Sequence, residues 1–369
     1  MKLLRLVSGS MLNNITNNLK NMKNLRVGVI GVGGIARSHM PGWKQSPHTE
    51  VVASSDINAE ALEKWGKNHG ISKLYQDPTE LINDTEIDIV DVCTPNSYHC
   101  DLTVAALNAG KHVICEKPLA PTASEIEKMI EARDRSGKKL MCAQHFRFGD
   151  GSKLVKDQAK SIGPIYHARS WMLRRNALPV RDGFLMKKHS GGGACIDIGV
   201  HVLDLTLWFM GNPEPKSVTG VARTELAKDH NAFSKMGVYN HDLMDVEELA
   251  AAFIRFENGA VLMLEVSWML HHEAGEFEDM QVWLYGKKGG LHWPSLEKLT
   301  SDPNSKSHSN ITLKPLPRSV EAHAQECIEF SEAIINDQPV PVPAEHSLQV
   351  MKILNSVYES QQTGKEVIL

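Results

Sequence analysis

Two short motifs in distant parts of the chain combine residue types suited to acid–base chemistry on an oxygen atom. The strand-like run 112–115 continues into Glu-Lys-Pro, whose lysine is Lys117. A lysine fixed there could donate a hydrogen bond to a substrate hydroxyl and stabilise negative charge developing on its oxygen. Farther along, Asp197 and His201 follow three consecutive glycines and lie four residues apart, so on a helix they would share one face. Because histidine titrates near neutral pH, His201 is the leading candidate for the base that removes a hydroxyl proton.

Each motif also has an ordinary structural explanation. A Glu–Lys pair at a strand end is most often a solvated surface pair, and a buried histidine can be satisfied by a nearby aspartate. Asp204, three residues beyond His201, is expected to have such a structural role. A catalytic interpretation of the two motifs therefore requires a redox cofactor, and another segment of the chain predicts one.

A glycine-rich segment near the N-terminus predicts a dinucleotide site. The apolar run Leu25–Ile30 leads into Gly31 and Gly33, and small Ala36 follows in a helix-forming stretch. The glycines permit a tight turn close to a pyrophosphate, and the helix N-terminus offers free N–H groups to the phosphates. A second apolar run ends at Asp56, 25 positions after Gly31, near the spacing of roughly 20 expected for a carboxylate that binds the adenosine ribose. Since this carboxylate would repel a 2′-phosphate, we expect NAD rather than NADP.

Other polar residues are weaker candidates for ligand contacts. Thr94, Pro95 and Asn96 follow a predicted strand and would either lie along the cofactor or form a rigid, capped turn. Three further side chains could reach a polar substrate, although loop arginines are commonly solvated: Arg147, Arg174 and His189. His271 and His272 have no further residue at a spacing typical of metal ligands, so no metal site is predicted.

The apolar pattern predicts an α/β protein with an N-terminal extension (1–24), a Rossmann domain (25–146) and a domain for substrate binding and oligomerisation (147–369). In residues 25–146, short apolar runs alternate with helical patterns, as in a parallel sheet wrapped by helices. The later residues favour an open, mostly antiparallel sheet backed by helices, with a hairpin of strands 248–256 and 260–268 around Asn-Gly. The remaining expectations there are strands at 165–174, 217–224, 281–285 and 311–314, helices at 319–336 and 348–363, and exposed loops at 228–241 and 301–309.

Composition limits the kind of protein and its partners. The chain has 369 residues, 42% hydrophobic and 23% charged, which is typical of a globular protein. A net charge of −4 predicts no nucleic-acid partner and no attraction to anionic membranes. Six scattered cysteines with no C-x-x-C pair indicate reduced thiols and a cytoplasmic location. Residues 1–24 have too short an apolar run for a signal peptide and are expected to form a loose extension.

Taken together, these motifs resemble the Gfo/Idh/MocA family, the glucose-fructose oxidoreductase and inositol dehydrogenase group, from about residue 25 onward. The resemblance rests on the glycine loop, on Thr94-Pro95-Asn96 with His99, on Glu116-Lys117-Pro118 and on Asp197 with His201. It implies a Rossmann domain joined to an α/β domain whose open sheet commonly forms an oligomer interface, hence a homodimer or homotetramer. It also implies NAD(P)-dependent oxidation or reduction of a sugar, polyol or related hydroxyl compound.

The resemblance further implies roles for individual residues. Lys117 would lie between nicotinamide and substrate, and Asp197 with His201 would handle the proton. The implied cofactor contacts are Gly31, Gly33, Gly34, Ile35, Asp56, Thr94, Pro95, Asn96, His99, Glu116 and Lys117. The segment 144–148 departs from the family's commoner Asn-x-Arg form at its first position, which leaves substrate contacts there open.

The expected reaction is hydride transfer between nicotinamide and a secondary alcohol or its ketone. In this hypothesis His201 removes the hydroxyl proton, Asp197 orients the imidazolium, and Lys117 stabilises charge on oxygen. Two alternatives remain open: a glycoside-cleaving enzyme that oxidises its substrate transiently with bound NAD, and a non-catalytic sensor of sugar or NAD. A sensor would have little reason to carry all three residues together.

Overall fold

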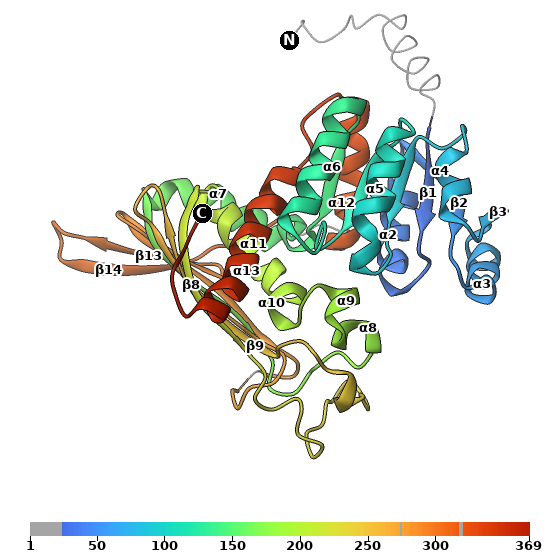
Figure 1. Cartoon of the computed structure of the whole chain (residues 1–369). Coiled ribbons are helices and arrows are strands. Elements are labelled where there is room, and N and C mark those ends of the chain that lie inside the picture. Colours follow the sequence, from blue (N-terminus) through green and yellow to red (C-terminus); the bar gives the residue numbers. More distant parts are fainter. Residues whose placement is uncertain (1–23, 274, 317–319) are drawn as a thin grey trace, which may run out of the picture.

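The first part of the chain forms a six-stranded parallel sheet in the computed structural model, which describes residues 24–273, 275–316 and 320–369 (Figure 1). The strand order is β3-β2-β1-β4-β5-β6, and such a sheet binds ligands outside the carboxyl ends of its strands, where the order reverses between β1 and β4. Its strands are β1 (Leu25–Ile30), β2 (Thr49–Ser55), β3 (Lys73–Tyr75), β4 (Ile89–Val92), β5 (His112–Glu116) and β6 (Leu140–Ala143). Its connecting helices are α2 (Gly34–Gln45), α3 (Ala59–His69), α4 (Pro78–Asn83), η1 (Asn96–Tyr98), α5 (His99–Asn108) and α6 (Ala123–Ser136).

Local sequence signals explain where these elements begin and end. Helix α6 has a complete capping box, in which Thr122 and Glu125 satisfy each other's backbone N–H groups, and it ends at Gly137 in the left-handed conformation. All residues of β4 and β6 are buried, because helices cover both faces of a parallel sheet. The predicted parallel sheet is therefore confirmed. The expected extension 1–24 lies outside the described residues, apart from residue 24.

The second sheet has nine strands in the order β14-β13-β12-β11-β7-β10-β9-β8-β15. All its neighbours are antiparallel except β7 and β10, so the mostly antiparallel sheet expected from the sequence is confirmed. Its strands are β7 (Ile165–Leu173), β8 (Pro215–Arg223), β9 (Leu249–Phe256), β10 (Val261–Ser267), β11 (Asp279–Gly286), β12 (Gly289–Trp293), β13 (Glu297–Asp302), β14 (Ser307–Thr312) and β15 (Val367–Ile368). The hairpin of β9 and β10 turns at the predicted Asn-Gly.

The predicted exposed loop at 301–309 is wrong, because these residues belong largely to the hairpin of β13 and β14. Every residue of β14 is exposed, so this outer strand carries no alternation of apolar and polar residues by which a strand is recognised. The strand expected at 311–314 overlaps only the end of β14, and β12 was not predicted. Residues 228–241 do form a loop, although Ser234 and Tyr239 in it are buried.

Helices near the C-terminus return to the first sheet and join the two halves of the molecule (Figure 1). Helix α12 (Ala322–Ile335) packs against α2, and helix α13 (Ala344–Thr363) packs against both α6 and β8. The other helices of this half are η2 (His145–Phe148), α7 (Asp150–Ala159), η3 (Lys160–Ile162), α8 (Asp182–Leu185), α9 (Lys187–Ser190), α10 (Ala194–Asp197), α11 (Gly199–Met210) and η4 (His241–Leu243). This return places residues of α12 beside the carboxyl end of β5.

Among the described residues, no single helix has the length and apolar character needed to cross a bilayer. One bent pair, Lys187–Asp197 with Gly199–Met210, passes that test only when its two parts are taken together. The six cysteines are all free and buried, as expected for reduced thiols.

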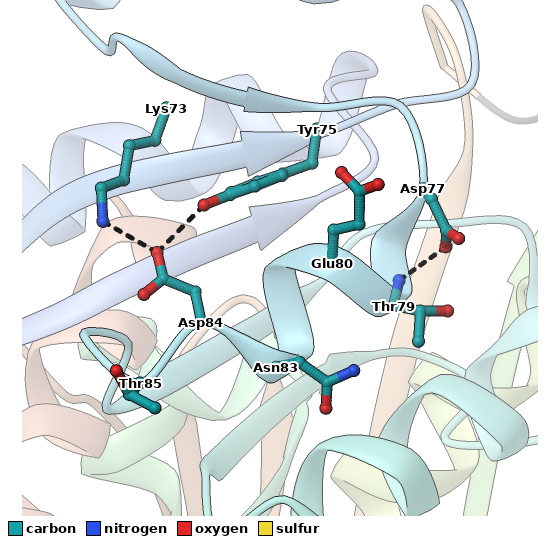
Figure 2. A pocket seen from close by; sticks show the side chains of 8 residues that line it. All are labelled: Lys73, Tyr75, Asp77, Thr79, Glu80, Asn83, Asp84 and Thr85. Atoms are coloured by element: carbon teal, nitrogen blue, oxygen red, sulfur yellow. Dashed lines mark hydrogen bonds and ion pairs between the residues drawn. The ribbon is translucent and has the colours of Figure 1, made fainter.

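A hollow on the outer edge of the first sheet lies between β3 and α4 (Figure 2). Asp84 accepts hydrogen bonds there from Lys73 (2.9 Å) and Tyr75 (3.1 Å). Asp77 caps α4 by accepting from the backbone N–H of Thr79 (2.8 Å). These polar groups satisfy one another, so the hollow has a structural explanation.

Candidate active site

The glycine loop has the geometry required to bind a dinucleotide. Gly31 has a φ of +88°, and a Cβ there would lie 2.6 Å from the carbonyl oxygen of Cys93, so only glycine fits. At Gly33 and Gly34 a Cβ would meet no atom within 4 Å, which leaves open space in front of the first turn of α2. Within the part of the chain that the structure describes, no side chain caps this helix, so its first N–H groups remain available to a phosphate.

Asp56 lies immediately after β2 and beside this loop. Its Oδ2 accepts a hydrogen bond from the backbone N–H of Val32 (2.9 Å), and its Oδ1 accepts one from that of Asn58 (2.9 Å). The carboxylate is thereby held at the carboxyl edge of the sheet, close to the open helix N-terminus. This donor and acceptor set fits the diphosphate and adenosine ribose of NAD, as the sequence predicted.

Lys117 connects the two halves of the protein. It follows β5, and its Nζ donates to the backbone carbonyl of Asp197 (3.0 Å) and to the Oδ1 of the same residue (3.2 Å). The second carboxylate oxygen of Asp197 accepts from the indole N–H of Trp268 (3.1 Å). Both charged side chains are more than four-fifths buried, so their attraction is less screened than that of a surface pair.

The expected contact between Asp197 and His201 is corrected by the structure. Helix α10 ends at Asp197 and α11 begins at Gly199, so the two residues do not share the face of one continuous helix. Lys117 and Trp268 occupy both oxygens of the aspartate instead. The Nδ1 of His201 is buried and has no hydrogen-bond partner within the described residues.

His201 has an environment that favours its neutral form. Burial lowers its pKa well below the usual value, and the positive charge of Lys117 adds to this effect. The guanidinium of Arg174 contributes in the same direction, although its Nε donates to Glu278 (3.0 Å). A neutral imidazole beside an ammonium can accept a proton from a hydroxyl that both groups contact.

The substrate role considered for Arg147 is wrong. Its guanidinium is 3% exposed and donates twice to the carboxylate of Asp204, at 2.6 Å each, and once to the Nδ1 of His346 (3.0 Å). A bidentate buried pair of this kind holds α11 to η2. The expectation that Asp204 is structural is confirmed. His189, the remaining candidate of this group, lies in α9 and is partly buried.

Two of the implied cofactor residues hold the protein together instead. His99 is fully buried, and its ring nitrogens lie 2.8 Å from the carbonyl oxygens of Thr94 and Pro118. It therefore ties the loop after β4 to the loop after β5 and is not placed to touch a cofactor. The amide of Asn96 donates to the carbonyl of Ser190 (2.9 Å), which joins this loop to α9.

Glu116 also points inward, into a buried ionic cluster that sequence reasoning missed. The Nε2 of His39 lies 2.9 Å from Glu116 and 3.4 Å from Glu326, and its Nδ1 lies 3.1 Å from both oxygens of Asp91. Trp43 donates a further hydrogen bond to Asp91 (2.7 Å). The cluster joins α2, β4, β5 and α12, and it supports the strand end that carries the catalytic candidate lysine. Its sequence signal is weak: single polar residues within apolar segments that are distant along the chain.

This cluster retains protons that an unfolded chain would release. Burial raises the pKa of Glu326 to about 8, and Asp91 raises the pKa of His39 well above its ordinary value despite burial. The negative charges of Glu116 and Asp91 add to burial in raising the pKa of Glu326, and these effects together outweigh the opposite effect of His39. His39, Glu116 and Glu326 lie close enough to share an ion, but the proton on His39 already accounts for their spacing.

We expect Glu326 to contribute stability that is lost as pH rises from about 5 to 8, and Glu326→Gln to remove this contribution. A carboxyl group whose folded pKa exceeds its unfolded pKa binds more protons when folded, so deprotonation favours unfolding. The neutral amide of the variant has no proton to lose. Melting temperatures measured across this pH range test the expectation, with Glu332→Gln, exposed on the same helix, as the control. Parallel curves for wild type and Glu326→Gln would contradict it.

Two of the three consecutive glycines before α10 are explained by close contacts with Glu247 and Tyr358. The buried carboxylate of Glu247 accepts from the backbone N–H groups of Gly193 (3.0 Å) and Cys195 (2.9 Å) and from the hydroxyl of Tyr358 (2.9 Å). A Cβ at Gly193 would lie 1.8 Å from the carbonyl oxygen of Glu247, and one at Gly192 would lie 2.1 Å from the hydroxyl of Tyr358. The glycines therefore allow α10 to sit close enough to β9 and α13 to present Asp197 to Lys117.

Comparisons with known proteins agree with this architecture. Residues 25–144 match the family model described as oxidoreductase family, NAD-binding Rossmann fold, and residues 158–369 match oxidoreductase family, C-terminal alpha/beta domain. D-glucoside 3-dehydrogenase of Escherichia coli (strain K12) is 30% identical over 351 residues, which cover 93% of this chain and 97% of that protein. Myo-inositol 2-dehydrogenase of Thermotoga maritima is 25% identical over 349 residues, 93% and 98% of the respective chains.

A solved structure of levoglucosan dehydrogenase with NADH and levoglucosan has a TM-score of 0.80 and 25% identity, over 94% of this chain and 99% of that one. The two family matches cover most of the chain, and the expected fold, enzyme class and nicotinamide cofactor are confirmed. The chain belongs to the Gfo/Idh/MocA family of NAD-binding oxidoreductases.

Proposed function

We propose that this protein is an NAD-dependent dehydrogenase that oxidises a secondary alcohol of a sugar or polyol, or reduces the corresponding ketone. The observation that carries the proposal is the contact between Lys117 and Asp197, which brings an ammonium from one half of the protein to the other half beside neutral His201. Relatives named as acting on a glucoside, on myo-inositol and on levoglucosan support a polyhydroxylated substrate.

In this proposal each residue has a separate task. The Nζ of Lys117 donates a hydrogen bond to the reacting oxygen and stabilises its negative charge as the proton departs. His201 accepts that proton on an imidazole nitrogen, which its lowered pKa leaves free near neutral pH. Asp197 holds Lys117 in place and is itself held by Trp268. NAD, when bound by the glycine loop and Asp56, supplies the acceptor for the hydride; reduction follows the same steps in reverse.

A screen of sugars and polyols against the purified protein tests the function. Methyl glucosides, myo-inositol and levoglucosan are incubated with NAD, and nicotinamide absorbance and product formation are both followed. Net NADH formation supports the dehydrogenase. Hydrolysis of a glycoside without net NADH would favour the transient-oxidation enzyme, and binding of a sugar with neither reaction would favour a sensor.

We expect NADH to bind more tightly than NADPH, and Asp56→Asn to reduce this preference by roughly tenfold or more. The carboxylate can accept hydrogen bonds from the ribose 2′-hydroxyl but repels a 2′-phosphate, whereas the amide lacks the repelling charge. Fluorescence titration of both cofactors into wild type and variant measures the ratio. Exposed Asp101→Asn is the matched control, and a wild-type preference for NADPH would refute the assignment.

We further propose that the protein is a cytoplasmic homo-oligomer with no nucleic-acid or membrane partner. Support comes from the open face of the nine-stranded sheet, where Phe253, Met263 and Arg169 are neighbours across β9, β10 and β7. Met263 is 49% exposed and Val221 on β8 is 42% exposed, so this face carries apolar surface that a second copy could bury. Light scattering coupled to size exclusion tests the proposal, with Met263→Glu expected to reduce the mass; a monomeric wild type would contradict it.

A further inference from the structure

Three imidazoles from three separate elements gather beside Lys117. His145 lies in η2, His201 in α11 and His323 in α12. The rings of His145 and His323 stack at 3.9 Å with planes 15° apart, and His201 approaches the ring of His145 edge-on at 5.1 Å. Positive charge on Lys117 contributes to the pKa of all three, so the cluster lies within electrostatic reach of the group expected to hold the reacting oxygen.

The ring nitrogens of this cluster have unused hydrogen-bonding capacity. The Nδ1 of His201 is buried without a partner, and within residues 24–273, 275–316 and 320–369 neither His145 nor His323 hydrogen-bonds to a protein group. The stacked pair cannot satisfy each other, because their N–H bonds lie in nearly parallel ring planes. The buried Nδ1 of His201 requires a partner, which a ligand can supply, and the half-buried rings of His145 and His323 are free to bind the same ligand.

The charge state of the cluster also suits neutral hydroxyl groups. Burial lowers the pKa of His145 and of His201 well below the ordinary value and lowers that of His323 as well. Glu116 acts on His323 in the opposite direction, while His39 and Lys117 reinforce the lowering. Each neutral ring then offers one donor and one acceptor, the pair of functions that a hydroxyl group complements.

An aromatic surface continues from the imidazoles. The ring of Phe146 lies 5.2 Å from that of His201 in an edge-on arrangement, and Trp293 on β12 lies 6.0 Å from Phe146. Sugar and cyclitol rings have apolar C–H faces and hydroxyls around the rim. A wall that combines aromatic faces with neutral donors and acceptors matches both features.

We propose that His145 and His323 bind the hydroxyl groups flanking the one that is oxidised, and so make the enzyme specific for ring compounds with hydroxyls on consecutive carbons. The proposal rests on the dehydrogenase function above and assigns two specificity residues to the same site. His201 and Lys117 contact the reacting oxygen, while His145 and His323 bind the hydroxyl groups on the neighbouring carbons. A secondary alcohol without flanking hydroxyls would make no hydrogen bonds to these ring nitrogens and would be turned over poorly.

The test combines two variants with monodeoxy sugars. His145→Phe and His323→Phe keep an aromatic ring in the stack but remove its nitrogens. Methyl glucopyranoside and its monodeoxy analogues serve as substrates; the position whose removal abolishes turnover is the oxidised one, and its neighbours are the flanking positions. His308→Phe, on the exposed strand β14, is the matched control.

We expect each variant to lower kcat/KM about 10- to 100-fold on the full sugar but less than about threefold on the analogue that lacks its flanking hydroxyl. Equal losses on the full and deoxy sugars would overturn the proposal, since they would indicate a structural effect alone. If wild type oxidises no sugar, the dehydrogenase function fails; titration of the NADH complex with the same sugars then decides the inference by itself. Binding that the two variants weaken supports it, and binding that they leave unchanged overturns it.

Discussion

Replacing Lys117 by Met should lower kcat by about 10²- to 10³-fold or more while NAD affinity changes little. The methionine keeps the length and apolar body of the side chain but removes the charge that faces the reacting oxygen, and loss of one such donor costs a rate factor of this order. It also breaks the ion pair with Asp197, whose Oδ1 lies 3.2 Å from the ammonium. Steady-state kinetics on the best substrate from the screen measures the loss, and quenching of protein fluorescence by NADH measures cofactor binding.

The design of this experiment separates chemistry from folding. Lys111→Met is a useful control because Lys111 is also buried, near the start of β5, yet among the described residues its ammonium donates only to backbone carbonyls of residues 84 and 87. Its variant should lose stability with little effect on turnover per folded molecule. If Lys117→Met kept the wild-type rate, Lys117 could not have the role assigned to it. If it lost NADH binding as well, its effect would arise from the cofactor site.

The elements that sequence reasoning found are those with strong local signals. The strands of the first sheet are buried on both faces and are apolar in sequence. Helix α6 can be recognised by its capping box and its terminal glycine. Gly31 could be identified for the same reason, since only glycine tolerates its backbone conformation. The hairpin of β13 and β14 gave no such signal. Every residue of β14 is exposed to water, so the strand needs no alternation of apolar and polar side chains.

The candidate site was predictable in its residue types but not in its pairing. Lys117, Asp197 and His201 could be singled out from motif and spacing. Asp197 can bind Lys117 because the chain breaks between α10 and α11 and because the carboxylate of Glu247 accepts a hydrogen bond from the backbone of α10. Both features depend on packing between segments that are distant along the chain. For the same reason Arg147 was wrongly predicted to contact substrate: its partners Asp204 and His346 lie 57 and 199 positions away along the chain.

Contributions from α12 were missed entirely because that helix is far from the motifs along the chain. Glu326 faces His39 in the buried cluster, and His323, one turn earlier, stacks on His145. Helical spacing alone indicates that the two are neighbours on one surface, but only the folded chain shows that this surface meets β5. One helix thus joins the support of the catalytic strand to the proposed recognition of substrate.

His201→Asn should lower kcat/KM by about 10²- to 10⁴-fold at neutral pH and remove the acidic limb of its pH dependence. In wild type the base must be neutral to accept a proton, so activity should rise with pH through the pKa of His201, which burial and Lys117 place below the ordinary value, and then level off. The asparagine cannot titrate, so the residual activity of the variant should not show this rise. Rates measured from acid to neutral pH, with a correction for the fraction folded, test both effects.

His346→Asn is the control. This histidine also has a pKa lowered by burial, to about 4, but it binds Arg147, so its variant is expected to leave the pH profile unchanged. An unaltered acidic limb in His201→Asn would transfer the role of base to another group, such as His145, whose ring lies 5.1 Å from that of His201 in an edge-on arrangement.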